Sequence, residues 1–260
     1  MLTKKSQRKE DGQLDIPLSP SPWNLKVKNS WILPFNKYNS KTTRINKDMN
    51  TTIISTNPLN NGNKEYSRED KDGLGMVMII SYSDSNVGPY DELLFAIPCK
   101  NPSINNELLP SYRIPVIYVS TEASVRNGRK NWGIRKELAN FNWKHTNGIL
   151  HQITSLVVTD RLTGEILFDG SFVTLFLPPI PLPMSWLGKL CPIIAERKID
   201  EEGVPIGNTW QLTKLGGFGW SRFSFAFVNS ILGNLKLFFG VHLRGSLLFP
   251  TPKEIPVIVN

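Results

Sequence analysis

Apolar residues in the first half of this chain fall in runs of strand length. Residues 23–35 are rich in strand-forming residues and alternate in part between apolar and polar positions, whereas 73–83 is a continuous apolar run. Alternation indicates a half-buried strand, and a continuous run of this length indicates a strand that is buried on both faces. These two segments predict β-strands, and further strands are expected at 90–99 and 112–120.

The second half continues in the same manner. Strands are expected at 141–146, 150–159, 165–177, 190–198 and 207–216. Asp160–Gly164 has the composition of a hairpin connection, and the proline-rich block 178–183 predicts an irregular crossing. Ser221–Leu235 fits two interpretations, because its phenylalanines alternate at first and then follow a helical spacing. It is expected to form a helix or two strands.

Helical character first appears after residue 120. Thr121 is a suitable N-cap, and Glu122 places a negative charge in the first turn, where the helix dipole favours it. Gly128 is expected to end this helix, since glycine is the preferred residue just past a helix C-terminus.

Two segments are too polar for a core. Residues 1–20 are predicted to be a disordered basic tail, and residues 36–73 a polar, asparagine-rich insertion outside the folded body. An insertion of this length inside a compact domain is a surface excursion or has a function. Residues 21–260 are therefore expected to form a single strand-rich domain of the α+β class with a few short helices.

Composition excludes several classes of protein. The two cysteines, Cys99 and Cys191, are too few for a disulfide framework and too far apart for a metal motif. The charged N-terminus is no secretory signal. Prolines interrupt the apolar stretch 170–188, and 223–235 is too short to span a bilayer. We expect a cytoplasmic protein without a transmembrane segment.

The formal net charge of +8 favours loose attraction to anions. The cations are scattered and no nucleic-acid motif is present, so nucleic acid is not an expected partner. The histidines His145, His151 and His242 are widely spaced and show no ligand pattern, so neither a metal site nor another cofactor is expected.

Residues with chemical potential concentrate between 120 and 143. Three cations come close together near Gly128, and Lys136 follows Gly133 with apolar residues on both sides. A lysine placed after a tight glycine-containing turn can point into a pocket. A surface position is the ordinary alternative for such a residue.

One pattern in this segment is similar to a known family. The string G-R-x-x-x-G-x-x-K-x-L, formed by Gly128, Arg129, Gly133, Lys136 and Leu138, resembles the signature of the acetoacetate decarboxylase-like family. The upstream strings 88–92 and 118–123 resemble it in order and spacing. Clear similarity extends from Gly75 to Trp143, and the version found here is most similar to the fungal branch.

The resemblance implies a barrel-like, mainly antiparallel fold around an apolar pocket. It implies that Lys136 forms a Schiff base with a ketone and that Glu92 is the acidic residue near this lysine. Tyr90, Arg129 and Arg135 become candidates for binding the substrate or shaping the pocket. For Arg129 the alternative is that it fixes the local loop by hydrogen bonds.

Imine chemistry sets a physical demand on the lysine. An amine attacks a carbonyl only when neutral, and about one unperturbed lysine in a few thousand is neutral at pH 7. Burial and a neighbouring cation lower a lysine pKa, and acetoacetate decarboxylase is itself the standard example of this activation. The protonated imine then accepts the electron pair left by departing CO2 or by a proton removed next to the carbonyl.

Three positions depart from the pattern of classical decarboxylases. Glu137 stands where they carry a second lysine, Val77 falls where they carry a second acid, and their arginine near the first strand has no match around Lys28–Ser30. Arg135 is left as a candidate for the neighbouring cation. The implied site is reduced compared with that of a classical decarboxylase.

Two classes of function remain open. The first is a lyase that acts on a keto acid or related carbonyl compound through Lys136. The second is a non-catalytic protein that binds an apolar small molecule or lipid in the same pocket. The expected partner is thus a small carbonyl or apolar molecule, and a homo-oligomer is one of the assembly states left open.

Overall fold

The protein consists mainly of β-strands in a computed structural model that describes residues 16–38, 73–99, 111–183, 193–199, 205–231 and 239–256. The first elements are β1 (Trp23–Tyr38), β2 (Gly73–Asp84), β3 (Tyr90–Cys99), β4 (Ser111–Arg113), β5 (Ile117–Val119), α2 (Glu122–Trp132) and β6 (Lys136–Asn147). They are followed by β7 (His151–Asp160), β8 (Ile166–Leu175), β9 (Ile180–Pro183), β10 (Ile193–Ile199), β11 (Pro205–Thr213), β12 (Gly216–Ile231), β13 (Phe239–Phe249) and β14 (Lys253–Pro256).

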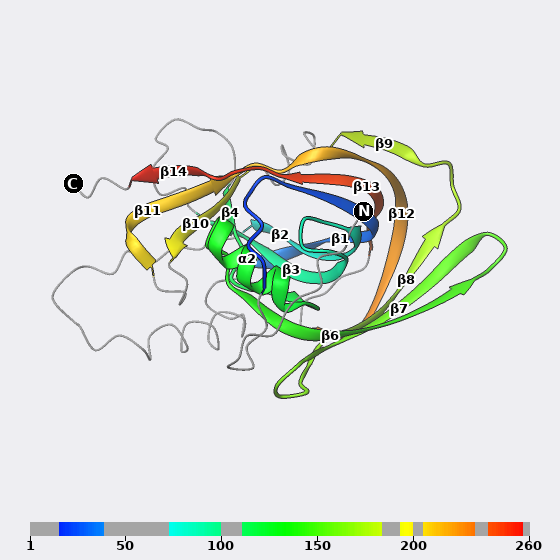
Figure 1. Cartoon of the computed structure of the whole chain (residues 1–260). Helices are drawn as coiled ribbons and strands as arrows, with labels where there is room; N and C mark the ends of the chain where they lie inside the picture. Colours follow the sequence, from blue (N-terminus) through cyan, green and yellow to red (C-terminus); the bar gives the residue numbers. More distant parts are fainter. Residues whose placement is uncertain are drawn as a thin grey trace.

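Nine of the described strands close into a barrel, in the order β3, β2, β1, β13, β12, β8, β7, β6 and β5, which pairs again with β3 (Figure 1). Neighbours around this ring are antiparallel except β5 and β6, which are parallel and joined through α2. From the end of β3 the sheet continues through β4, β10, β11 and β14. The expected class, mainly antiparallel and barrel-like, is confirmed, and α2 is the one helix among the described residues.

Both faces of the strands β1 to β3 are buried, each in a different cluster of side chains. Along β2, Val77 and Ile79 belong to a cluster inside the ring, to which strands from all around the barrel contribute. Met78 and Ile80 belong to a second cluster on the opposite face, between these strands and α2. This double burial explains why 73–83 is a continuous apolar run.

The helix begins as expected but ends later. The side chain of Thr121 accepts a hydrogen bond from the amide of Ser124, which is the bond of an N-cap. The helix ends at Gly133, which has φ 63° and whose N–H donates to the carbonyl of Arg129 at 2.9 Å. The expected stop at Gly128 is therefore wrong, since Gly128 lies inside the helix.

Other expectations were corrected by tertiary pairing. The segment 112–120 is divided into β4 and β5, which pair with different parts of β3. Ser221–Leu235 is mostly one long strand, β12, because β8 and β13 pair with it on either side. Part of the proline-rich block forms the short strand β9 along β12, and β13 has no counterpart among the strands predicted from the sequence.

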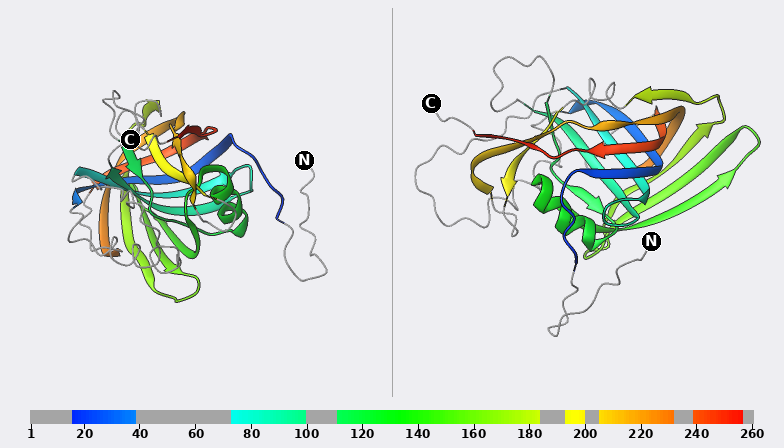
Figure 2. Two further views of the ribbon diagram at one scale, coloured as in Figure 1. Left: turned by 90° about the vertical axis from the view of Figure 1, so that its left-hand side faces the viewer. Right: turned by 45° about the horizontal axis from the view of Figure 1, so that its top comes forward.

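The chain before β1 runs along α2, where Figure 2 shows it beside the helix. The amide of Ser19 donates to Asn127 Oδ1 at 2.6 Å, and Asn131 Nδ2 donates to the Ser19 carbonyl at 2.8 Å. Residues 1–15 of the expected tail and 39–72 of the expected insertion lie outside the described residues. No helix in the described part of the chain is long and apolar enough to cross a membrane.

Candidate functional site

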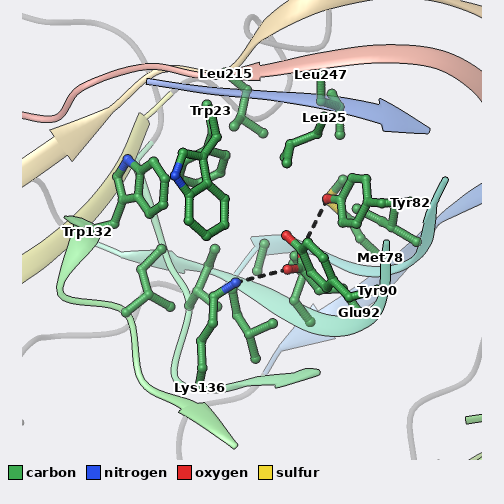
Figure 3. Close-up of a pocket in the computed structure, with 17 residues that line it drawn as sticks. Trp23, Leu25, Met78, Tyr82, Tyr90, Glu92, Trp132, Lys136, Leu215 and Leu247 are labelled. Carbon is green, nitrogen blue, oxygen red and sulfur yellow. Dashed lines mark hydrogen bonds and ion pairs between the residues drawn. The ribbon is translucent and has the colours of Figure 1, made fainter. Parts of the chain in front are cut away.

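A pocket lies in the cluster between the outer face of the barrel and α2. Most of its wall is apolar, and Lys136 and Glu92 are the charged residues in it (Figure 3). The empty space amounts to about 620 Å³, a figure that includes open solvent at its mouth. The lining consists of Trp23, Leu25, Met78, Ile80, Tyr82, Tyr90, Glu92, Leu94, Ala96, Ile114, Ile117, Trp132, Ile134, Lys136, Leu215, Leu247 and Phe249.

Lys136 and Glu92 form a buried ion pair at the pocket wall. Lys136 Nζ lies 3.1 Å from Glu92 Oε2, and the two side chains are 5% and 7% exposed. Lys136 is the first residue of β6, and Glu92 lies in β3, with β5 between the two strands. The closed ring therefore brings together an acid and an amine that are 44 residues apart in the sequence.

The helix provides the space and a polar contact for the lysine. Gly128 lies on the face of α2 that the Lys136 side chain crosses, and a Cβ there would stand 2.4 Å from Lys136 Cε. One turn earlier, the buried hydroxyl of Ser124 lies 3.2 Å from Lys136 Nζ. Gly128 and Ser124 are four residues apart and so share a helix face, which is the only signal in the sequence that points to Ser124.

Two tyrosines complete the polar part of the pocket. The hydroxyl of Tyr82 donates to Glu92 Oε1 at 3.4 Å, and the Tyr90 ring centroid lies 5.5 Å from Lys136 Nζ. Burial, followed by the charge of Glu92, raises the pKa of both phenols well above its ordinary value. Both hydroxyls stay protonated and serve as hydrogen-bond donors. Tyr90 was expected here from the sequence, whereas Tyr82 was missed.

The neighbours of Lys136 in the sequence point away from the pocket. Arg135 Nε donates to Glu137 Oε1 at 2.7 Å, and both side chains are partly exposed. Alternation along the strand places them on the face opposite to Lys136. Arg135 was a candidate for shaping the pocket, but it is not among the lining residues. Glu137 pairs with Arg135 instead of approaching the lysine. Burial lowers the Arg129 pKa, the charge of Glu137 opposes this shift, and the charge of Arg135 adds to it.

Arg129 fixes the backbone at the start of β6. Its guanidinium donates to the carbonyl of Lys136 at 2.6 Å, and it is not among the residues that line the pocket. This is the loop-fixing alternative that the sequence left open. The bond connects α2 directly to the residue that carries the amine.

The position expected for a second acid lies on the wrong face of β2. Val77 is buried inside the barrel, while its neighbour Met78 lines the pocket. No arginine is among the described lining residues. The described part of the chain also contains no group of three metal-ligating side chains. The described polar groups of this pocket are therefore one amine, one carboxylate and two phenols.

Comparisons with known proteins match part of the chain to one family model. The family model described as acetoacetate decarboxylase (ADC) matches residues 67–173, a range that includes Glu92, α2 and Lys136. No curated protein matches the chain significantly in sequence.

Solved structures share the fold over most of the chain. The structure from "Structural Studies of Acetoacetate Decarboxylase" is similar with a TM-score of 0.59 at 13% identity, covering 94% of this chain and 93% of that one. Acetoacetate decarboxylase from Legionella pneumophila is similar with a TM-score of 0.56 at 14% identity and 98% coverage of both chains. The enduracididine biosynthesis enzyme MppR complexed with pyruvate has a TM-score of 0.53 at 11% identity, covering 96% and 95%. The chain therefore has the acetoacetate decarboxylase-like fold.

Proposed function

We propose that the chain is an acetoacetate decarboxylase-like enzyme, a lyase in which Lys136 forms a Schiff base with a keto acid or related carbonyl compound. The observation that supports this most is the buried Lys136–Glu92 ion pair in the wall of an apolar pocket. Isolated buried charges are costly and rare, and paired ones in a cleft are candidates for catalysis. The similarity to a fold that also occurs in a pyruvate complex is consistent with a keto acid as ligand.

The chemistry follows from the positions of the two groups. Glu92 takes a proton from the Lys136 ammonium, and the neutral amine attacks the ligand carbonyl. The carbinolamine loses water with a proton returned by Glu92, which leaves a protonated imine. For a β-keto acid, the C–C bond to the carboxylate then breaks, CO2 leaves, and the electron pair moves into the imine to form an enamine. Protonation at carbon and hydrolysis release the ketone and restore the lysine.

The apolar wall assists the step in which CO2 is lost. The substrate carboxylate carries a charge before the bond breaks and loses it as CO2 forms. A poorly solvating environment therefore raises the ground state more than the transition state. The same wall makes binding of the carboxylate costly, so the lining favours a substrate with a substantial apolar part.

Trapping of the imine tests this function. Wild-type protein is incubated with short and long β-keto acids and with pyruvate, reduced with borohydride, and examined by mass spectrometry after proteolysis. We expect the mass of a reduced adduct on the peptide that contains Lys136. Lys136→Arg is the matched control, because arginine keeps the charge but stays protonated and cannot supply a nucleophile. It should abolish trapping while the far-UV circular dichroism is unchanged.

A second function is favoured by the composition of the wall. Apart from the four polar residues, the lining is entirely aliphatic, aromatic or thioether, as expected for a protein that binds an apolar molecule without chemistry. This alternative predicts no adduct with any keto acid. It also predicts that a hydrophobic ligand raises the melting temperature of wild-type protein and of Lys136→Arg equally. These two results together would refute the proposal that the chain is an enzyme.

A further inference from the structure

The interior of the barrel has a second polar region, on the opposite face of β1 from the lysine pocket. Along β12, Ser224 and Ala226 face the interior, and alternation places Arg222 on the same face. In the pairing register Arg222 is opposite His242 of β13, and His242 is opposite Trp31 of β1. These three side chains form one row across neighbouring strands.

A bulge in β1 contributes to this region. The register of β1 against β13 shifts between Val27 and Ser30. Because of this bulge, odd-numbered residues such as Val27 lie on the outer face before it, and odd-numbered residues such as Trp31 lie on the inner face after it. The bulge directs Asn29 toward β13, where Asn29 Oδ1 lies 3.1 Å from His242 Nε2 and accepts from Arg244 Nε at 3.0 Å. Arg244 lies two residues beyond His242 and thus on the same face of β13.

Cations gather here without an acidic partner. Arg222 Nε donates to the carbonyl of Leu177 at 3.0 Å, and Arg244 Nε to Asn29. Within the described ranges neither guanidinium, nor Lys28 beside them, forms an ion pair with a carboxylate. An arginine has five N–H donors, so each guanidinium keeps its terminal amino groups for a further acceptor.

These cations lie close enough to two histidines to lower the pKa of each. Burial, followed by the charges of Arg244 and Arg222, lowers the pKa of His242 to about 3. Burial, followed by the charges of Lys28 and Arg244, lowers the pKa of His145. Both rings are therefore neutral near pH 7, and the positive charge of the region comes from the arginines and Lys28.

Two buried indole N–H groups lie in the same cluster. Trp31 Nε1 and Trp143 Nε1 are shielded from solvent and have no hydrogen-bond partner among the described residues. The Trp31 ring centroid lies 4.8 Å from that of His242 and 5.8 Å from that of Trp143. Buried donors are almost always satisfied in folded proteins, so a pair of orphaned indoles indicates a missing acceptor.

We propose that this end of the barrel binds a small oxyanion, a carboxylate or phosphate, between Arg222 and Arg244, with Trp31 and Trp143 as additional donors. The anion balances a group of cations that has no counter-charge in the described structure. Forked guanidinium donors match the geometry of such oxygens. Arg244 is exposed and Arg222 is partly exposed, whereas the two indole N–H groups are shielded from solvent, so the occupant is a small molecule and not a folded acidic partner.

Calorimetry with inorganic phosphate and with acetate, at constant ionic strength adjusted with chloride, tests the site. We expect saturable binding of at least one probe, with the two arms showing whether phosphate or carboxylate is preferred. Arg222→Gln and Arg244→Gln should each weaken binding at least tenfold, and Arg222→Lys should weaken it less. Lys136→Arg alters the lysine pocket and not this region, so it should bind as wild type does, which separates the two sites.

Two further measurements separate a binding role from a structural one. In the absence of the probe, Arg222→Gln should leave the melting temperature unchanged or raise it, because it relieves repulsion from Arg244; a purely structural arginine would lower it. In proton–nitrogen correlation spectra the indole signals of Trp31 and Trp143 should shift on titration, with Trp143→Phe used for assignment. Absence of saturable binding by both probes, or undiminished binding in the Arg222→Gln/Arg244→Gln variant, would overturn the proposal.

Discussion

Lys136 and Glu92 stabilise each other only as a pair. Each side chain is almost completely buried in apolar surroundings, where an isolated charge is far less stable than in water. The attraction between them offsets this desolvation, but a buried pair rarely adds net stability over apolar residues of similar size. A buried ion pair in such a position is easier to explain by function than by folding.

Replacement of one partner tests this balance. Glu92→Gln leaves the Lys136 ammonium buried without a counter-charge, and we expect the free energy of unfolding to fall by about 3–5 kcal/mol. The double variant Glu92→Gln/Lys136→Met should recover most of this loss, because no charge remains. Denaturant unfolding of the four proteins measures the effect, and a double variant as unstable as Glu92→Gln would contradict it.

The junction between α2 and β6 sets the geometry of the amine. The C-cap at Gly133 reverses the chain, Arg129 holds the carbonyl of Lys136, and Gly128 leaves room for its side chain. Each of these features is local, within nine residues of the lysine in sequence. The element as a whole positions a long flexible side chain that would otherwise have many rotamers.

Gly128→Ala should separate positioning from folding. The new methyl group would collide with the flexible end of Lys136 and not with backbone, so we expect displacement of the amine. Alanine is also the better helix former, by about 1 kcal/mol, so stability should hold. Imine trapping should fall at least tenfold while the melting temperature changes little.

Gly133→Ala is the matched control for this variant. It places a side chain at φ 63° at the C-cap of the same helix, which should cost about 1–2 kcal/mol of stability through backbone strain. Its trapping should be reduced less than that of Gly128→Ala once folding is accounted for. Equal trapping by Gly128→Ala and wild type would show that Gly128 serves only the packing of the helix.

At the scale of the whole molecule, the barrel separates two environments with different charge. The lysine pocket outside β1 has an acid and a base in balance, whereas the buried His242 lies near an excess of cations that are at least partly exposed. Both share β1, so a single strand with a bulge carries residues for each. The net charge of +8 is therefore not distributed evenly between them.

The buried His242 gives the fold a specific dependence on pH. Its pKa is about 3 in the folded protein against 6.5 for an unperturbed histidine, so below pH 6.5 the unfolded chain binds a proton that the folded one does not. This stability is fully present above pH 6.5 and is lost as the pH falls toward 3, by at most about 1.4 kcal/mol per unit. His145, whose pKa is also lowered, acts in the same direction.

Urea unfolding between pH 6.5 and 5 measures this slope. Most carboxylates are still ionised in this window, so histidines dominate the change. The slope should become shallower in His242→Gln, which keeps a side-chain donor for Asn29 but cannot titrate. An identical slope in both proteins would show that His242 is protonated or accessible in the folded state.

Local sequence patterns were sufficient to predict the elements that depend only on residues close together in the chain. Double-faced apolar runs gave β2 and β3, and the N-cap Thr121 located the start of α2, because these signals need no distant partner. Through the family resemblance, the sequence also indicated Lys136 and Glu92 as residues of one pocket. Nothing in their spacing alone gave the 3.1 Å between them.

Only the tertiary structure decided which face each strand residue occupies. A shift of one position moves a side chain to the opposite face, and this placed Arg135 and Val77 outside the pocket and Lys136 inside it. The long strand β12 and the role of Gly128 likewise depend on partners that are not adjacent in sequence, β8 and β13 for the strand and the Lys136 side chain for the glycine. Closure of the ring fixes these contacts, because it brings β3, β5 and β6 together although α2 separates β5 from β6 along the chain.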